Sequence, residues 1–323
     1  MTDTSPPFQI LAIDGGGIRG MFAAAVLAHL EKDLETSIAN HFDLITGTST
    51  GAIIALGLGM GLRPAEILEF YFTHGLAIFP LGFQGHLRSL LHWGFRKHDP
   101  GPLQRALREC FGDRLLGHSS KRIVIPTFNM DGNDVRLFKT AHHERLRRDH
   151  KIPVWQIAMA TTAAPTYLPG FLGIDRQWLV DGGVWANNPT MVGLTEATGV
   201  LGIPFESVSI LNIGTLSNLP KHSRFLITGG KIPWARHIAD LLTSAQGTSV
   251  VNQARLILGE ERVIRIDSSI PDGLLSLDRF APDDLISRAS RDSQHVTPII
   301  AEKLIPHTAP TFVPCHATKG GAQ

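Results

Sequence analysis

Two consecutive runs of strand, glycine turn and helix constrain the fold of this chain more than any other feature. The first begins with a β-branched and aromatic stretch at Phe8–Ile13, which ends abruptly in three glycines. Apolar side chains then recur at i+4 spacing through Met21–Leu34, as in an amphipathic helix. The second run has a strand expected at Phe42–Thr46, a glycine turn, and a helix of small apolar residues over Ala52–Leu58. This order predicts parallel strands joined by helical crossovers.

Further strands are expected at short β-branched or aromatic stretches later in the chain. These are Arg122–Phe128, Val135–Phe138, Trp178–Val180, Val208–Ile213 and Val263–Ile266. Because helical or irregular segments separate them, we predict an α/β fold with a mostly parallel sheet covered by helices. No linker rich in proline or serine and no internal repeat divides the chain, so residues 1–323 are expected to form one domain.

Composition narrows the classes of function. Lys plus Arg (30) nearly balances Asp plus Glu (29), for a formal net charge of +1. That is too little for general electrostatic binding to a nucleic acid polymer. The two widely separated cysteines, Cys110 and Cys315, make no disulfide framework and fit a reducing compartment. No spacing of His, Cys, Asp or Glu suggests a metal site, and we expect no metal and no cofactor. The N-terminus lacks the regions of a signal peptide, so a cytoplasmic location is expected.

The pentapeptide Gly47–Gly51, Gly-Thr-Ser-Thr-Gly, fits the nucleophile elbow G-x-S-x-G. In that motif a serine occupies a tight turn between a strand and a helix, and the small neighbours let the backbone pass without a clash. The expected flanking strand and helix supply this context. Ser49 is therefore the candidate nucleophile, with Gly47 and Gly51 as its supporting glycines.

A second glycine turn, Asp14–Gly20, lies between the first expected strand and helix. Its backbone N–H groups can converge on an anion near a helix N-terminus. In a serine hydrolase that anion is the tetrahedral oxyanion. Arg19 can order this loop or add positive charge.

The same loop satisfies the dinucleotide fingerprint G-x-G-x-x-G through Gly15, Gly17 and Gly20, so a nucleotide-binding module is an alternative. That fold needs an acid near the end of the next strand to hold the ribose. Here the next strand runs directly into the elbow, and Asp33 and Glu35 fall within the helical pattern. The fingerprint therefore lacks its expected partner.

Asp181 follows an expected strand and precedes Gly182 and Gly183. A base for Ser49 can lie at such a strand end, although an Asp before two glycines also often only caps a turn. A Ser-Asp-His triad remains an alternative because several histidines follow Asp181 in the chain. These are His222, His237, His295, His307 and His316.

The three motifs, in this order, resemble those of the patatin-like phospholipase family. The family's oxyanion loop D-G-G-G-x-R-G matches Asp14–Gly20, its elbow matches Gly47–Gly51, and its D-G-[AG] motif matches Asp181–Gly183. The stretches Thr162–Pro169 and Asn187–Pro189 also look like family sequence around the active site. Three ordered motifs are far more specific than any one of them alone.

The resemblance covers about residues 8–215 and implies a three-layer patatin-like fold with helices on both faces of the sheet. It leaves a helical part at about 216–310 in which regulation is expected. It further implies a lipid acyl hydrolase that cleaves membrane phospholipid at the inner face of the membrane. Ser49 and Asp181 would form a catalytic dyad without histidine. Gly15, Gly16 and Gly17 would supply N–H groups to the oxyanion hole, to which Arg19 would also belong. A catalytically silent lipid-binding protein is a further alternative.

Within that family, the chain is similar to effectors of CBASS anti-phage systems, whose phospholipase activity is switched on by a cyclic nucleotide. The likeness lies in Phe8–Gly20 and in the short length of the chain. It implies a cyclic di- or trinucleotide activator. Residues 79–97 combine aromatic, apolar and basic side chains, and are expected to form either an interfacial lid or an ordinary helix and loop.

Overall fold

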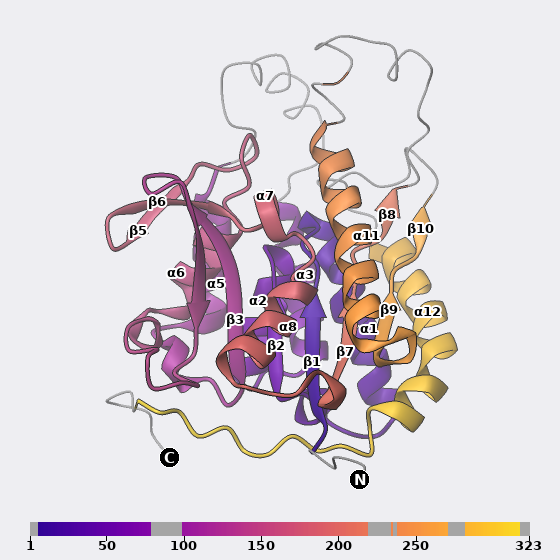
Figure 1. Cartoon of the computed structure of the whole chain (residues 1–323). Helices are drawn as coiled ribbons and strands as arrows, with labels where there is room; N and C mark the ends of the chain where they lie inside the picture. The colour runs from indigo at the N-terminus through magenta and orange to yellow at the C-terminus, as the bar shows by residue number, and fades with distance from the viewer. Residues whose placement is uncertain (1–5, 79–98, 219–233, 235–237, 271–281, 317–323) are drawn as a thin grey trace.

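The computed structural model describes residues 6–78, 99–218, 234, 238–270 and 282–316. Within these ranges, an eight-stranded sheet has the order β5-β6-β3-β2-β1-β7-β9, with β4 also paired to β3 (Figure 1). The strands are β1 (Phe8–Ile13), β2 (Leu44–Gly47), β3 (Arg122–Asn129), β4 (Asp134–Lys139), β5 (Phe171–Ile174), β6 (Gln177–Asp181), β7 (Val208–Ile213) and β9 (Val263–Ile266). A separate parallel pair consists of β8 (Ser217–Asn218) and β10 (Ser269–Ile270).

The pairing confirms the predicted α/β architecture. β1, β2, β3, β7 and β9 pair in parallel, whereas β4 and β6 are antiparallel to β3, and β5 is antiparallel to β6. The sequence analysis did not predict β5, which is four residues long and half exposed at the sheet edge. A short edge strand with little buried apolar surface gives a weak periodic signal.

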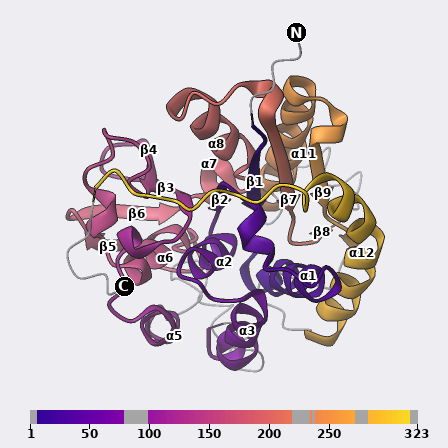
Figure 2. The same cartoon turned by 90° about the horizontal axis from the view of Figure 1, so that it is seen from below.

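Helices cover both faces of the sheet, as Figure 2 shows. The helices are α1 (Gly20–Asp33), α2 (Thr50–Gly59), α3 (Pro64–Ile78), α5 (Gly101–Phe111), α6 (Val154–Thr161), α7 (Gly183–Ala186), α8 (Thr190–Thr195), α11 (Ile238–Leu258) and α12 (Pro282–Lys303). On one face lie α1, α2, α3 and α12, and on the other lie α7, α8 and α11. In these same ranges, the helices include none with both the length and the apolarity to cross a bilayer.

Strand β1 explains why a continuous apolar run forms the centre of the sheet. Every residue of β1 is buried. Its side chains alternate between two cores because successive residues of a strand face opposite sides. Leu11 and Ile13 pack into the core under α1 and α2, and Ile10 and Ala12 pack into the core under α8 and α11. Burial on both faces is typical of parallel strands in α/β proteins.

The pairing of β3 brings two of the predicted motifs together. β2 pairs with the first part of β3, where Thr46 lies opposite Val124. β6 pairs with a later part of β3, where Asp181 lies opposite Thr127. β6 therefore ends just beyond the carboxyl end of β2, at the point where the elbow begins. The predicted lid at 79–97 lies outside the described residues.

Candidate active site

The structure places Ser49 in a strained turn between β2 and α2. Ser49 has φ of 54°, in the left-handed region that non-glycine residues rarely occupy. An added Cβ at Gly47 would lie 2.2 Å from the Gly51 carbonyl oxygen, and one at Gly51 would lie 2.4 Å from the Ile13 carbonyl oxygen. Both glycines are therefore required by close backbone contacts. Such strain is typical of a nucleophile elbow and is often found at functional sites.

Asp181 lies beside Ser49 at the end of β6. Its carboxylate accepts the Gly183 N–H at 2.7 Å, and the Ser49 hydroxyl is close enough to the carboxylate to lower its pKa. Burial raises the pKa of Asp181 to about 6, although the Gly183 N–H and the Ser49 hydroxyl oppose this rise. Gly182 is needed because a Cβ there would lie 2.3 Å from the Pro126 carbonyl oxygen. A buried carboxylate with a raised pKa, placed beside a serine hydroxyl, is equipped to act as a base.

The glycine loop after β1 lies against the elbow, and its N–H groups differ in their partners. Gly15 donates to the Asn187 carbonyl at 2.9 Å, and Gly16 donates to the Thr50 hydroxyl at 3.3 Å. In contrast, the N–H of Gly17, whose φ is 59°, has no acceptor in the described part of the chain. The same holds there for the N–H of Thr50, the residue after Ser49. These two N–H groups therefore remain available as donors in the glycine loop and in the elbow.

Arg19 and Gly20 hold the loop in shape. The Arg19 side chain donates to the Gly16 carbonyl at 3.3 Å and to the Leu216 carbonyl at 2.8 Å. A Cβ at Gly20 would lie 2.9 Å from the Thr50 side chain, so glycine allows α1 to begin close to α2. Arg19 thus orders the loop through two carbonyls.

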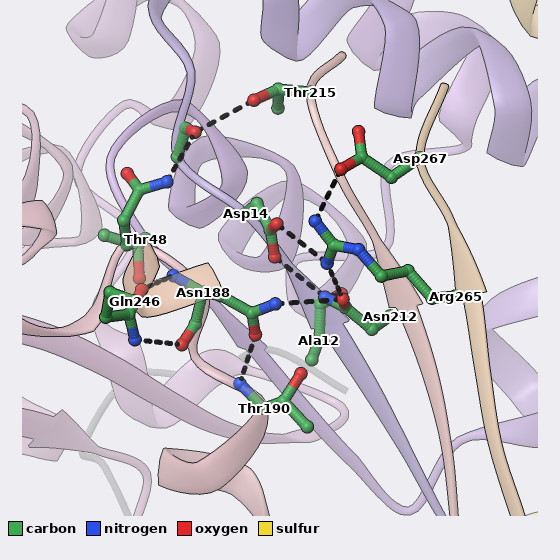
Figure 3. A network of polar contacts seen from close by, with 12 residues as sticks. Ala12, Asp14, Thr48, Asn188, Thr190, Asn212, Thr215, Gln246, Arg265 and Asp267 are labelled. Carbon is green, nitrogen blue, oxygen red and sulfur yellow. Dashed lines mark hydrogen bonds and ion pairs between the residues drawn. The ribbon is translucent and has the colours of Figure 1, made fainter. Parts of the chain in front are cut away.

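Asp14, the first residue of the loop motif, does not contact the dyad in the structure. Its buried carboxylate accepts bonds from Asn212 at 2.7 Å and from Arg265 at 3.1 Å. Burial raises the pKa of Asp14 to about 6, and the Arg265 guanidinium opposes that rise. Asp14 therefore belongs to a polar network beneath the loop (Figure 3).

Two threonines at the site were missed by the sequence analysis. Thr161 accepts the Ser49 N–H at 3.1 Å and donates to the Pro126 carbonyl at 2.8 Å, which ties the elbow to β3. Thr215 donates to the Gly15 carbonyl at 2.9 Å. Neither lies in a motif, although Thr161 directly precedes the Thr162–Pro169 stretch that resembles the family. A lone threonine carries no signal by itself in one sequence.

Among the described residues, no hydrogen bond joins a histidine to Ser49 or Asp181, as a Ser-Asp-His triad would require. His307 pairs with Asp43 at 2.8 Å, at the opposite end of β2 from Ser49. His316 bonds the Glu144 carbonyl at 2.8 Å. His222 and His237 lie outside the described residues. Within those residues, no group of three His, Cys, Asp or Glu side chains is arranged to hold a metal ion.

Known proteins resemble this chain both in sequence and in fold. Residues 11–194 match the family model described as patatin-like phospholipase. The cGAMP-activated phospholipase of Pseudomonas aeruginosa (strain BWHPSA011 / Pa011) is 36% identical over 83% of this chain and 80% of that protein. The cGAMP-activated phospholipase of Vibrio cholerae serotype O1 is 30% identical over 90% of each chain. The solved structure of VipD from Legionella pneumophila has a TM-score of 0.52 and 13% identity, over 91% of this chain and 67% of that one, a likeness of fold alone.

Proposed function

Because the chain belongs to the patatin-like phospholipase family, we propose that it cleaves fatty-acyl esters of membrane phospholipids with a dyad of Ser49 and Asp181. Family membership makes the chain a lipid acyl hydrolase. The roles of the two residues are the proposal. The observation that carries it is the placement of a buried carboxylate, whose pKa is raised to about 6, beside the Ser49 hydroxyl at neighbouring strand ends.

In this mechanism Asp181 takes the proton of Ser49 as the hydroxyl oxygen attacks the ester carbonyl. A carboxylate of ordinary pKa is a weak base at neutral pH. Burial strengthens Asp181 as a base, and yet leaves it mostly ionised at pH 7 because its pKa of about 6 lies below that pH. Asp181 then returns the proton to the leaving alcohol, and water hydrolyses the acyl-enzyme.

The oxyanion of the tetrahedral intermediate is assigned to the N–H groups of Gly17 and Thr50. Both are without an acceptor in the described ranges, and the residue after the nucleophile commonly supplies one donor in hydrolase elbows. Gly15 and Gly16 shape the loop, because their own N–H groups are bonded to Asn187 and Thr50. Ser49 caps α2, so the positive end of that helix dipole adds to the stabilisation.

The test compares two variants with matched controls on a soluble short-chain ester and on phospholipid vesicles. Ser49→Ala and Asp181→Asn should each lower kcat by at least about a thousandfold, since each removes a partner in proton transfer. The controls Ser249→Ala and Asp113→Asn, at exposed positions, should keep wild-type kcat. A fluorophosphonate should label wild-type protein at Ser49 alone. A folded Ser49→Ala protein that hydrolyses the ester at the wild-type rate would contradict the dyad. A folded wild-type protein that neither hydrolyses the ester nor is labelled would favour a lipid-binding or nucleotide-binding role.

A cyclic nucleotide is proposed as the activator of this hydrolase. The support comes from the two relatives with 36% and 30% identity, both cGAMP-activated phospholipases. An ungated phospholipase would damage the membranes of its own cell. The ligand can shift the enzyme to an active state only by binding that state more tightly. Cytoplasmic action at the inner membrane face and a role in anti-phage defence remain predictions that depend on this gating.

The activation test measures fatty-acid release from vesicles with cGAMP, with other cyclic di- and trinucleotides, and with a linear dinucleotide as control. Activity should rise with one of the cyclic nucleotides, and the same nucleotide should bind Ser49→Ala in calorimetry. Full activity of ligand-free protein, unchanged by every nucleotide, would contradict gating and leave the hydrolase assignment intact. Phage plating on cells that carry the wild-type or Ser49→Ala chain, with a cyclase that makes the active nucleotide, tests the defence role.

A further inference from the structure

A buried network of hydrogen bonds and ion pairs links the glycine loop to β9 (Figure 3). In the sequence, β9 lies beyond residues 11–194, which match the family model. The Arg265 guanidinium contacts the Asp14 carboxylate at 3.1 Å and the Asp267 carboxylate at 2.6 Å. It also contacts Asn212, which donates to Asp14. The exposed fractions of the Arg265, Asp14 and Asp267 side chains are 18%, 6% and 8%. One cation therefore compensates two buried carboxylates, and fixes the residue from which the glycine loop begins.

The network also reaches the far side of the loop. Asp267 accepts the Leu216 N–H at 3.1 Å, and the Leu216 carbonyl accepts from Arg19 at 2.8 Å. Arg19 in turn donates to the Gly16 carbonyl at 3.3 Å. Arg265 thus supports the loop at Asp14 directly, and at Gly16 through three further residues.

A second support comes from α11. The Gln246 side chain accepts the Asn188 N–H at 3.0 Å and donates to the Asn188 carbonyl at 3.2 Å. The preceding residue, Asn187, makes a similar pair with Gly15. Its carbonyl accepts the Gly15 N–H at 2.9 Å, and its side-chain amide donates to the Gly15 carbonyl at 3.1 Å. Two successive paired contacts therefore connect α11 to the glycine loop.

The glycine loop is packed so closely against the nucleophile that a displacement of its backbone would change the rate of the reaction. A Cβ at Gly15 would lie 3.3 Å from the Ser49 Cβ and 2.5 Å from the Asn187 side-chain oxygen. The backbone of the loop is therefore packed directly against the nucleophile. Groups that stabilise an oxyanion must be held to within about 0.5 Å of their productive positions. Small displacements of Gly15 or Gly16 would carry the adjacent Gly17 N–H out of place.

We propose that Arg265 and Gln246 are positioning residues that hold the oxyanion loop from the C-terminal part of the chain. The inference rests on the proposed function, since it assumes that this loop stabilises the oxyanion. Neither residue touches Ser49 or Asp181. Both act through the backbone of residues 14–17, one through Asp14 and the other through Asn188 and Asn187.

The experiment measures kcat and KM for a soluble p-nitrophenyl ester, so that binding to a membrane does not enter. Gln246→Ala should lower kcat about tenfold and leave KM within about twofold, because the oxyanion forms only in the transition state. The rate of labelling by a fluorophosphonate should fall in parallel. Gln253→Ala is the matched control, since Gln253 is exposed on the same helix and, among the described residues, its side chain bonds Ser249 and not the glycine loop. It should keep the wild-type kcat and labelling rate.

Arg265→Lys and Arg265→Met complete the test. Lysine keeps the charge but cannot bridge both carboxylates as the guanidinium does, so its kcat should lie between those of the wild type and of the methionine variant. Arg265→Met removes the guanidinium that lies between two buried carboxylates and can fail to fold. If Arg265→Met does not fold, the kcat of Gln246→Ala tests the positioning role. Circular dichroism and thermal unfolding must show that each variant compared is folded at the assay temperature.

The outcomes separate this inference from the proposed function. Wild-type kcat in folded Gln246→Ala and Arg265→Lys, with an inactive Ser49→Ala, would overturn the positioning role and leave the dyad standing. A decrease in kcat fully accounted for by unfolded protein would overturn it as well. Wild-type activity in Ser49→Ala would instead remove the proposed function.

Discussion

The two glycine turns of the site lie side by side but are held in different ways. The elbow, residues 47–51, takes its shape mainly from close contacts of its own backbone and that of β1, such as Gly51 against Ile13. The glycine loop, residues 14–20, depends on side chains far along the chain. Asn187 and Arg265, which bond Gly15 and Asp14, are 172 and 251 residues away in sequence from those partners.

This difference shows how robust each turn is to substitution. A backbone contact cannot be relieved by changing another side chain, whereas a contact with a side chain can. The elbow should therefore tolerate no larger residue at its glycines. The shape of the glycine loop should be sensitive to substitutions at many distant positions. A clash between this loop and a side chain should, however, be relieved by a second substitution of that side chain.

Gly47→Ala should have the largest effect. The added Cβ would lie 2.2 Å from the Gly51 carbonyl oxygen and 2.8 Å from the Ala52 nitrogen. Because these are backbone atoms of α2, the helix must shift, and we expect a loss of at least about 3 kcal/mol in the free energy of unfolding. Chemical denaturation measures this loss, and ester hydrolysis should be abolished. Gly199→Ala, where a Cβ meets nothing within 4 Å, is the control. Equal stability of the two variants would contradict the conclusion that close backbone contacts require glycine at position 47.

Gly16→Ala should also lower stability and kcat strongly, but a second substitution should restore part of both. Its Cβ would lie 2.1 Å from the Thr215 hydroxyl oxygen and 2.4 Å from the Thr215 Cβ. We expect a loss of about 1–3 kcal/mol in the free energy of unfolding, together with a loss of kcat. Adding Thr215→Gly removes the clashing atoms at the cost of one hydrogen bond, and should restore part of both quantities. A double variant no better than Gly16→Ala would show that the backbone, and not the Thr215 side chain, limits this loop.

The pH dependence involves one carboxylate next to each turn. Burial raises the pKa values of Asp14 and Asp181 to about 6, from an ordinary value of 3.8. The folded protein therefore holds these protons more tightly than the unfolded chain. The stability that they contribute is full below pH 3.8 and is lost as the pH rises through about 6. Activity should change in the opposite direction, because Asp181 must be ionised to act as a base. Below pH 6, kcat/KM should fall about tenfold per pH unit.

Asp181→Asn separates these two effects. The variant carries no charge at this position, so it should unfold at a higher temperature than the wild type at pH 7.5 while it lacks activity. Thermal unfolding and ester hydrolysis between pH 5 and pH 8 measure both. A wild-type rate that stays constant down to pH 4.5, with the protein folded, would contradict the role of Asp181 as the base.

Tyr71→Phe should have the smallest effect. The buried Tyr71 hydroxyl donates to the Thr50 carbonyl at 2.9 Å, in the first turn of α2. Its loss should lower the free energy of unfolding by about 1 kcal/mol. If the elbow is held by its own backbone, kcat should remain within about twofold of the wild type. A tenfold loss of kcat in the folded variant would mean that Tyr71, in addition to Thr161, positions the elbow for catalysis.

Much of the fold was predictable because local pattern and tertiary environment agree. The predicted bounds of β1, β7 and β9 match the structure, since β1 and β7 are largely apolar runs buried in the parallel sheet and β9 is a short β-branched run. The edge strand β5 was missed because it is short and half exposed. The extent of the domain, 1–323, and the lid at 79–97 remain predictions.

The sequence by itself determined which groups are proposed to carry the chemistry. Gly47, Ser49 and Gly51 sit in one turn, and Asp181 sits at a strand end, because local sterics and strand propensity act over a few residues. Only the tertiary structure decided that β6 ends beside β2, which brings Asp181 to Ser49. It alone also placed Thr161, Gln246 and Arg265 around the site. Their contacts depend on how distant segments pack, and a single polar side chain carries no periodic signal from which such packing can be inferred.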